Sequence, residues 1–498
     1  MVARPSGLAA HASHNRGELG VSSRVLIRNG WIVTMDPELG DITGGSLLIE
    51  DSRIAEIGQD IPVPEGCEVI DADGMIVIPG LVDMHKHLWQ TALRGVVADL
   101  TLVDYFHGVR RNYLSRYRAE DVRVGTYVGA LELLHSGTTT VLDHSHGVVT
   151  PEHADALAEA ELGAGIRGVW AYGYCPVEAQ DGSEAFPSHA ARVEDAFRVR
   201  DQYFSSDTSL LRMGIAMTEQ GLLPLELTEN ELRSAQEMDA VWTTHCHCGP
   251  GNAPVTRGFH TLQGKGFIDH RAVLSHCNEF GVDDFAVVAE LGAHFASSPD
   301  SEIALGIARP TPYMYALLAG VQPCLGTDCV TCMSTDMFGC MRMALTFARH
   351  QFNSGPGHTF ETVTEQVVST RDVFRWATIE GAKALGLEDR IGSLVPGKAA
   401  DVVLVDASAI NLAPVLDPVA DLVLHAHAGN VDTVLIDGIV RKRNGKLVDV
   451  DLNKLLAELA ASRDYLVGDA DVSDAFATNK DDLAQETQDW SERVTQVS

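Results

Sequence analysis

The sequence predicts an α/β protein in which a parallel barrel of strands and helices carries a small β domain built from both ends of the chain. Between residues 81 and 385, short apolar strands alternate with helical segments, which is typical of parallel strands joined by crossover helices. Residues 23–80 and 386–450 instead form short β-rich runs separated by turn residues. For 498 residues, a barrel of eight units fits this alternation better than an open sheet.

The β domain is predicted from two groups of segments that lie far apart in the sequence. The first group comprises VLIRNGWIVTM, GGSLLIEDSRIAEIG and CEVIDADGMIVIPG, and the second comprises ADVVLVDAS and VDTVLIDGIVRKRNGKLV. Asn-Gly and Asp-Gly pairs stand where hairpins would turn. Because both groups have the same character, we expect them to form one composite domain.

The barrel is predicted from pairs of helices and strands that follow one another along the chain. Residues 119–137 read as a helix that ends at a glycine, and residues 138–145 read as the strand that follows it. The same pattern predicts further helices at 154–165, 283–292 and 310–320, and further strands at 166–174, 272–277, 293–299 and 321–328.

The two ends of the chain differ from this pattern. Residues 1–22 lack the apolar segment of a secretory signal and are expected to be a flexible leader. Residues 451–498 hold 11 acidic and 4 basic side chains. Within this acidic tail, LNKLLAELAASRDYL is expected to form one amphipathic helix, and the remainder to be polar and mobile.

Charge and cysteine content narrow the class of protein. The chain has 37 lysines and arginines against 69 aspartates and glutamates, a formal net charge of −32. Such a surface repels phosphate backbones and anionic lipids, so we expect neither nucleic acid nor membrane as a partner. No run of apolar residues approaches the length of about 20 residues that a helix needs to cross a bilayer. Nine cysteines, an odd number, without an export signal predict reduced thiols and a cytoplasmic location.

Side chains that bind metals stand at the ends of separate expected strands, where the catalytic groups of a parallel barrel gather. They are His85 and His87 in LVDMHKH, His144 and His146 after Asp143 in TTTVLDHSH, His245 and His247 in VWTTHCHC, His276 in AVLSHC, and Asp328 in CLGTD. Residues two apart on a strand point the same way, so His85 and His87 can chelate one ion. The whole set predicts a metal site.

The chemistry of this site follows from its donor atoms. Imidazole nitrogens with one carboxylate suit zinc, with iron, cobalt or manganese as alternatives, rather than calcium. Such an ion lowers the pKa of a water molecule, and a neighbouring carboxylate takes the released proton. Asp328 is placed both to touch the metal and to carry that proton, and His276 is placed to hydrogen-bond the attacked centre or the water.

These residues resemble the amidohydrolase superfamily, in its cytosine-deaminase and chlorohydrolase branch. The resemblance covers almost the whole chain and includes LVDMHKH, GTTTVLD, VLSHC, SSPDSEIALG, AGVQPCLGTD, GSLVPGKAADVVLVD and VDTVLIDGIV in the family's order. It implies a distorted (β/α)8 barrel with a composite β-sandwich domain. It also implies a metal held by His85, His87, one histidine of the fifth strand and Asp328, with His276 as the histidine of the sixth strand.

The fifth-strand ligand departs from the pattern of this branch, which often reads H-x-H-x-x-E. We favour His245 as the ligand because it directly follows the extended run VWTT, and Cys248 then occupies the position of the glutamate. If His247 is the ligand instead, Pro250 stands there. Either way the glutamate is missing, which weighs against deamination of a cytosine- or guanine-like ring.

The number of metal ions and the substrate contacts complete the predicted site. No lysine occurs between Lys86 and Lys265, so there is none to be carboxylated between two metals, and one ion is favoured. Glu219 is the alternative, as a bridge to a second ion. We expect Trp89, Gln90, His144 and His146 to contact the substrate, with Tyr105 and Phe106 in a pocket wall or lid.

The predicted function is therefore that of a mononuclear metal-dependent hydrolase. It would cleave a carbon–nitrogen bond of amide, urea, carbamate or amidine type in a small neutral molecule. The alternative is an aminohydrolase or dechlorinase of a purine, pyrimidine or triazine ring, in which His144 or His146 replaces the glutamate. A scaffold without catalysis is disfavoured because the metal-binding residues are present. Relatives of this kind often assemble, so we expect a homo-oligomer.

Overall fold

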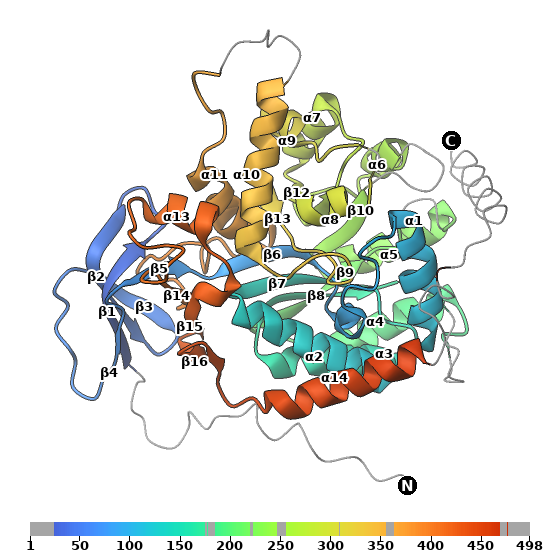
Figure 1. The fold of residues 1–498 in the computed structure, drawn as a ribbon. Helices are drawn as coiled ribbons and strands as arrows, with labels where there is room; N and C mark the ends of the chain where they lie inside the picture. Colours follow the sequence, from blue (N-terminus) through green and yellow to red (C-terminus); the bar gives the residue numbers. More distant parts are fainter. Residues whose placement is uncertain are drawn as a thin grey trace.

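The structure is a computed structural model that describes residues 24–174, 177, 185–219, 223–246, 255–307, 309–354, 363–468 and 476. The expected leader and all but the first part of the acidic tail lie outside these residues. In Figure 1 strands from the beginning and the end of the chain belong to one sheet, next to a barrel that the middle of the chain forms. The predicted fold class is confirmed by this arrangement.

The composite sheet joins strands from both ends of the chain. Its strands are β1 (Arg24–Val33), β2 (Asp41–Glu50), β3 (Arg53–Gly58), β4 (Glu68–Asp71), β5 (Met75–Pro79), β14 (Val402–Asp406), β15 (Val431–Ile436), β16 (Ile439–Arg443) and β17 (Lys446–Leu447). Hydrogen bonds join them in the order β17-β16-β15-β14-β5-β1-β2-β3, with β4 on β1. The antiparallel pair β5–β14 connects the two groups, and apolar side chains such as Val77 and Val402 bury its faces.

The barrel consists of parallel strands in sequential order. They are β6 (Leu81–Lys86), β7 (Thr138–Ser145), β8 (Arg167–Gly173), β9 (Leu211–Ala216), β10 (Trp242–Cys246), β11 (Ala272–His276), β12 (His294–Ser297) and β13 (Pro323–Leu325). The segment after β13 returns to β6 through an isolated parallel bridge between Lys86 and Asp328. Because all eight strands run the same way, their carboxyl ends meet at one mouth of the barrel.

Most of the helices connect the barrel strands and cover the outside of the barrel, whereas the last five come after the final barrel strand. They are α1 (Leu102–Tyr105), α2 (Ala119–His135), α3 (Pro151–Ala164), α4 (His189–Tyr203), α5 (Leu225–Glu237), α6 (Val255–Gly264), α7 (Val282–Leu291), α8 (Pro299–Ala304), α9 (Tyr313–Leu318), α10 (Met337–Ser354), α11 (Thr370–Arg375), α12 (Gly381–Ala384), α13 (Pro418–His425) and α14 (Leu452–Val467). Residues 106–113 and 376–380 are π-helical, and 88–93, 114–116 and 428–430 are 3₁₀ turns. Within the described part of the chain, no helix combines the length and the apolarity that a membrane span requires.

Local sequence explains where these elements begin and end. α2 ends before Gly137, whose φ of +91° lets the chain turn directly into β7, as the sequence predicted. The predicted amphipathic helix of the tail is α14, which lies along α2 in Figure 1. The exact domain boundaries remain a prediction.

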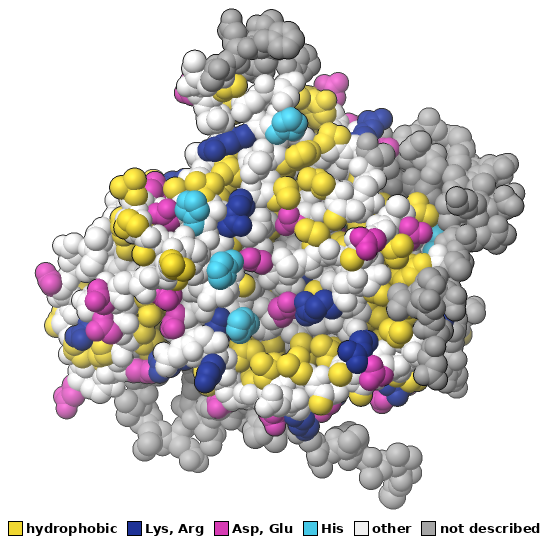
Figure 2. Space-filling view, in the orientation of Figure 1, with side chains coloured by type: hydrophobic (Ala, Val, Ile, Leu, Met, Phe, Trp, Pro, Cys, Tyr) yellow, Lys and Arg dark blue, Asp and Glu magenta, His cyan; other side chains and the backbone are white. Residues whose placement is uncertain are grey.

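A buried ion pair ties the barrel to the composite sheet. Arg167, at the start of β8, donates to both carboxylate oxygens of Asp401 at 2.7 and 3.0 Å and to Asp437 at 3.1 Å. Arg167 and Asp401 are almost inaccessible to solvent. On the face shown in Figure 2, in contrast, acidic and basic side chains are interspersed over the surface.

Candidate metal centre

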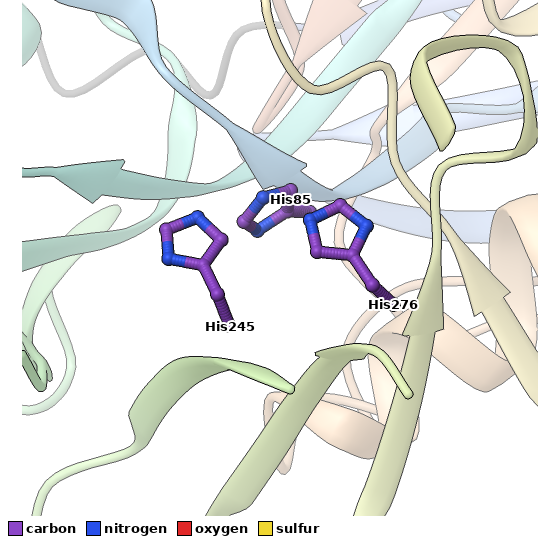
Figure 3. Close-up of side chains that lie close together, drawn as sticks. All are labelled: His85, His245 and His276. Atoms are coloured by element: carbon purple, nitrogen blue, oxygen red, sulfur yellow. The ribbon is translucent and has the colours of Figure 1, made fainter. Parts of the chain in front are cut away.

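Four strand ends bring their histidines and one aspartate together at the mouth of the barrel. His85 and His87 lie on or directly after β6, His245 on β10, His276 at the end of β11, and Asp328 three residues after β13. The rings of His85, His245 and His276 converge from different strands (Figure 3). All five side chains are buried. The structure thus brings together the residues that the sequence selected as ligands, apart from His247, which lies outside the described residues together with Cys248 and Pro250.

The distances between the donor atoms are short. His87 Nε2 lies 3.3 Å from Asp328 Oδ1, and His85 Nε2 lies 3.6 Å from the same oxygen. His245 Nε2 lies 3.3 Å from His87 Nε2. Three overlapping sets of these side chains have ligand atoms within 4.8 Å of one another, and one of the sets includes His146.

His85, His87 and His245, whose Nε2 distances are given above, are each also contacted at the second ring nitrogen, Nδ1. His87 Nδ1 donates to the backbone carbonyl of His144 at 2.8 Å, and His85 Nδ1 lies 2.9 Å from the Ser275 hydroxyl. His245 Nδ1 lies 3.0 Å from the Glu219 carboxylate. Such contacts fix the tautomer and the orientation of a histidine that binds a metal.

These contacts make the cluster fit a cation. The His144 carbonyl can only accept a hydrogen bond, so His87 Nδ1 carries a proton. The negative charge of Glu219, 3.0 Å from His245 Nδ1, favours the proton of that ring on the same nitrogen. Burial and the neighbouring His85 ring lower the pKa of His245 well below its usual value, so this ring is neutral. The lone pairs on the two Nε2 atoms therefore face each other at 3.3 Å, and that of His87 also lies 3.3 Å from the Asp328 carboxylate. This arrangement is repulsive unless a positive ion lies between them, and nitrogen donors with one carboxylate are typical of zinc sites.

Backbone hydrogen bonds fix Asp328 against the first strand of the barrel. The Asp328 amide donates to the His85 carbonyl at 2.8 Å, and the His87 amide donates to the Asp328 carbonyl at 3.3 Å. The Ser301 hydroxyl donates to Asp328 Oδ2. Asp328 has a φ of +52°, in the left-handed region that non-glycine residues rarely adopt.

His276 is oriented by a residue that sequence reasoning missed. His276 Nδ1 lies 3.1 Å from Glu302 Oε1, and Glu302 also accepts from the Ser298 amide and the Thr311 hydroxyl. Burial alone would lower the pKa of His276, but Glu302 and Asp328 raise it overall. Glu302 lies inside the motif SSPDSEIALG, but on α8 rather than at a strand end. The sequence pattern that located the other site residues, namely their position at strand ends, therefore did not identify Glu302.

A buried ion pair between Arg110 and Glu219 lies next to His245. Arg110, from the π-helical segment 106–113, donates to Glu219 Oε1 at 2.6 Å and to Oε2 at 3.4 Å. Burial alone would raise the pKa of Glu219, but the charge and hydrogen bonds of Arg110 lower it to about 2. Glu219 is therefore a carboxylate that holds His245 Nδ1. Arg110 was not among the predicted residues, because nothing in its local sequence points to the barrel.

The residues that the sequence assigned to substrate contact lie beside this cluster. The His144 ring is 4.2 Å from the His245 ring between centroids, and the His146 ring is stacked on His87 at 4.2 Å. Burial lowers the pKa of both His144 and His146 well below the usual value; neighbouring histidine rings add to this for His144, and Arg110 does so for His146. Gln90 donates to the Tyr105 hydroxyl at 2.7 Å, and Trp89 donates to His146 at 2.8 Å. Their contact with substrate stays a prediction.

The fold and this cluster define the protein as a barrel hydrolase with a site able to hold a metal ion. A model of the amidohydrolase family matches residues 76–441, and the chain belongs to that family. The sequence prediction of the family, and of an enzyme that hydrolyses carbon–nitrogen bonds, is confirmed.

Several relatives and solved structures match nearly the whole chain. A 5'-deoxyadenosine deaminase of Methanosarcina mazei is 29% identical over 89% of this chain and 98% of its own length. A 5-methylthioadenosine/S-adenosylhomocysteine deaminase of Symbiobacterium thermophilum is 30% identical over 83% of this chain and 92% of its own. Among solved structures, an adenosine deaminase from Xanthomonas campestris with bound zinc has a TM-score of 0.75 at 23% identity, covering 89% of this chain and 98% of that one. Atrazine chlorohydrolase of Arthrobacter aurescens TC1, complexed with zinc, has a TM-score of 0.77 at 23% identity, covering 88% and 100%.

Proposed function

We propose that His85, His87, His245 and Asp328 hold one divalent ion, zinc in preference to iron, manganese or cobalt, and that the protein uses it to hydrolyse a carbon–nitrogen bond of a small neutral molecule. The observation that carries this proposal is the facing lone pairs: His87 and His245 turn unprotonated nitrogens toward each other, and His87 Nε2 also faces the Asp328 carboxylate. When bound, such an ion supplies a water of lowered pKa as the nucleophile at neutral pH.

The side chains of the site have separate roles in the reaction. Asp328 accepts the proton of the attacking water and passes it to the leaving nitrogen, because its Oδ1 lies within 3.6 Å of the Nε2 atoms of both His85 and His87. His276, held at Nδ1 by Glu302, stabilises charge that develops on the attacked group. Glu219 and Arg110 keep His245 in its ligating orientation. The buried site excludes bulk water and so strengthens each of these interactions.

We infer that the substrate is an adenine-type nucleoside and that the bond cleaved joins the exocyclic amine to the ring. The names of the relatives support this inference, since the deaminases described above act on 5'-deoxyadenosine, methylthioadenosine and related compounds. A second candidate is an amide, urea or carbamate. It is favoured by the absence from the sequence of a glutamate three residues after His245 or His247, where Cys248 or Pro250 stands.

Metal analysis combined with a substrate panel tests both candidates. Purified protein is analysed for metal, stripped with a chelator, and reconstituted with zinc, iron, manganese or cobalt. Each form is then assayed for ammonia release from adenosine, 5'-deoxyadenosine, guanine, cytosine and triazines, and for amine release from ureas and anilides. We expect one equivalent of metal and ammonia release from the adenine nucleosides. Full activity in metal-free protein would contradict the proposal, and amine release alone would favour the second candidate.

We further propose that the protein is a homo-oligomer and that it is located in the cytoplasm. The mass of the protein in solution, measured by light scattering, would test the assembly, and fractionation of the source cells would test the location. A monomer, or recovery of the protein outside the cytoplasm, would contradict them.

A further inference from the structure

His146 makes a hydrogen bond that determines where its proton lies. It follows β7, and the indole Nε1 of Trp89 lies 2.8 Å from His146 Nδ1. An indole N–H is a donor and never an acceptor. His146 Nδ1 must therefore accept, which means that this nitrogen carries a lone pair and no proton.

The tautomer of the ring follows directly. A neutral imidazole with an unprotonated Nδ1 carries its proton on Nε2. The doubly protonated ring would turn an N–H group toward the Trp89 N–H group, so the same contact disfavours the cation. His146 is thus an uncharged side chain with a hydrogen-bond donor at Nε2.

This donor is buried and has no partner among the described residues. His146 is 2% exposed, and its Nε2 atom makes no hydrogen bond within that part of the chain. A buried donor without a partner is costly, so native proteins retain one chiefly where a ligand or a water completes it. The ring is stacked on His87, and one of its nitrogens lies within 4.8 Å of ring nitrogens of His87 and His245. The ring that carries this donor therefore lies beside the side chains of the metal site.

We propose that His146 is a specificity-determining residue whose Nε2–H donates a hydrogen bond to an acceptor atom of the substrate, a ring nitrogen or a hydroxyl oxygen. This inference rests on the proposed function for the identity of the substrate. It excludes two other roles. With a proton on Nε2 and a hydrogen bond at Nδ1, the ring has no free lone pair with which to bind a second ion. A neutral imidazole N–H is also far too weak an acid to replace the missing glutamate as a proton donor.

The first test measures the tautomer without any substrate. Nitrogen-15 NMR of zinc-loaded protein labelled at histidine distinguishes a protonated from an unprotonated ring nitrogen, and the His146 signals are assigned by their loss in His146→Phe. We expect an unprotonated Nδ1 and a protonated Nε2. In Trp89→Phe, which keeps a large ring but removes the donor, we expect the two tautomers to mix.

Trp170 provides a matched control for the Trp89 variant. It is also fully buried, but its indole N–H has no hydrogen-bond partner among the described residues. Trp170→Phe therefore imposes a similar loss of packing without removing a hydrogen bond. We expect it to leave the His146 signals unchanged. A change of equal size in both variants would show that packing, not the indole donor, sets the tautomer.

The second test measures specificity with analogues that each lack one acceptor. The zinc-loaded enzyme is assayed with adenosine and with its 3-deaza, 7-deaza, 2'-deoxy and 3'-deoxy analogues. We expect one analogue to lose about tenfold in kcat/KM, the usual effect of leaving a buried donor unpaired. In His146→Phe, which keeps the stacked ring, adenosine should fall to the level of that analogue and the difference between the two should disappear. His146→Gln, which restores an amide donor, should recover part of it, and serves if the Phe variant fails to fold.

Three results would overturn the inference: a protonated Nδ1 in the NMR spectrum, a second metal equivalent that His146→Phe abolishes, or equal losses for every analogue in the variant. Failure of the proposed function looks different. If the enzyme does not turn over adenosine but releases amines from ureas or anilides, the substrate assignment is wrong. The NMR result still decides the tautomer in that case, and the same comparison of variants is made with urea and thiourea pairs, which differ in their acceptor.

Discussion

Replacing Glu219 by glutamine should weaken metal binding and the folded state together, because this carboxylate serves both His245 and Arg110. Glutamine has the same size and still offers an oxygen to His245 Nδ1, which lies 3.0 Å from Oε1. It carries no charge, however, so the guanidinium of Arg110 loses the partner that lies 2.6 Å away. Both side chains are about nine-tenths buried, so solvent screens the pair little.

The size of the effect follows from the pKa of Glu219. Its fall from the usual 4.5 to about 2 corresponds to about 3 kcal/mol in favour of the carboxylate. Coulomb's law gives about 4 kcal/mol for charges about 4 Å apart at an effective dielectric constant of about 20. Because the pKa is lowered in the folded state, this stabilisation is complete above pH 4.5 and is lost as the pH falls toward 2. At neutral pH, Glu219→Gln should therefore cost about 3 kcal/mol.

Two measurements separate the roles of the pair. Thermal unfolding of chelator-treated protein reports stability, and competition with a coloured chelator reports zinc affinity. For Glu219→Gln we expect a lower melting temperature at neutral pH, a smaller difference from the wild type at acidic pH, and a zinc affinity lower by about tenfold or more. The matched control is Arg167→Met, which breaks another buried ion pair far from the cluster. It should lower stability but leave zinc affinity unchanged.

A wild-type zinc affinity in Glu219→Gln would refute the role of this carboxylate in holding His245. Equal losses of affinity in Glu219→Gln and Arg167→Met would refute it as well, since the effect would then reflect general destabilisation. An unchanged melting temperature in both variants would instead show that buried pairs of this kind contribute little net stability, as some do.

Four further predictions follow from the site and its surroundings. Chelation should abolish activity, and one equivalent of zinc should restore it, measured by metal analysis alongside the assay. Asp328→Asn should retain the fold but lose about 10²–10⁴-fold in kcat, the usual contribution of a positioned proton carrier. Gly326→Ala should lose the metal, because a Cβ there would lie 2.7 Å from the His85 backbone nitrogen. Burial raises the pKa of Glu161 well above its usual value and that of Asp143 to about 6, so the folded state holds protons that the unfolded chain releases, and stability falls as the pH rises. Glu161→Gln should flatten that fall, measured by melting temperatures from about pH 4 to about pH 8.

The parts of the fold that local sequence controls were predictable. The helix α2 and the strand β7 lie where the apolar pattern and the glycine between them placed them. The alternation of side chains along β6 likewise predicted that His85 and His87 point the same way, and their ring centroids lie 4.8 Å apart. These features depend on a few neighbouring residues, so no knowledge of the tertiary structure was needed.

The supporting residues of the site could not be predicted in the same way. Arg110 and Glu219 are separated by 109 positions, and the contact depends on how a π-helical connection folds back over the barrel. Glu302 contacts His276 from the first turn of a short helix rather than from a strand end. Periodicity locates the ends of strands, but it does not report which side chains from the connecting segments reach them. The contacts of Glu219 with His245 and Arg110 became visible only in the folded structure, and its predicted alternative role as a bridge to a second ion stays a prediction.

Backbone strain gives the last argument for a preorganised site. His276 and Asp328 have φ values of +75° and +52°, which cost about 1–3 kcal/mol each for side chains of this kind. Strain of this size persists only where the surroundings over-determine the conformation. Around Asp328 they do, because its amide and carbonyl are both bonded to the first strand and its carboxylate accepts from Ser301. These contacts therefore hold the Asp328 carboxylate toward the histidines. The free-energy cost of the backbone strain is incurred when the protein folds rather than when it binds its metal or substrate.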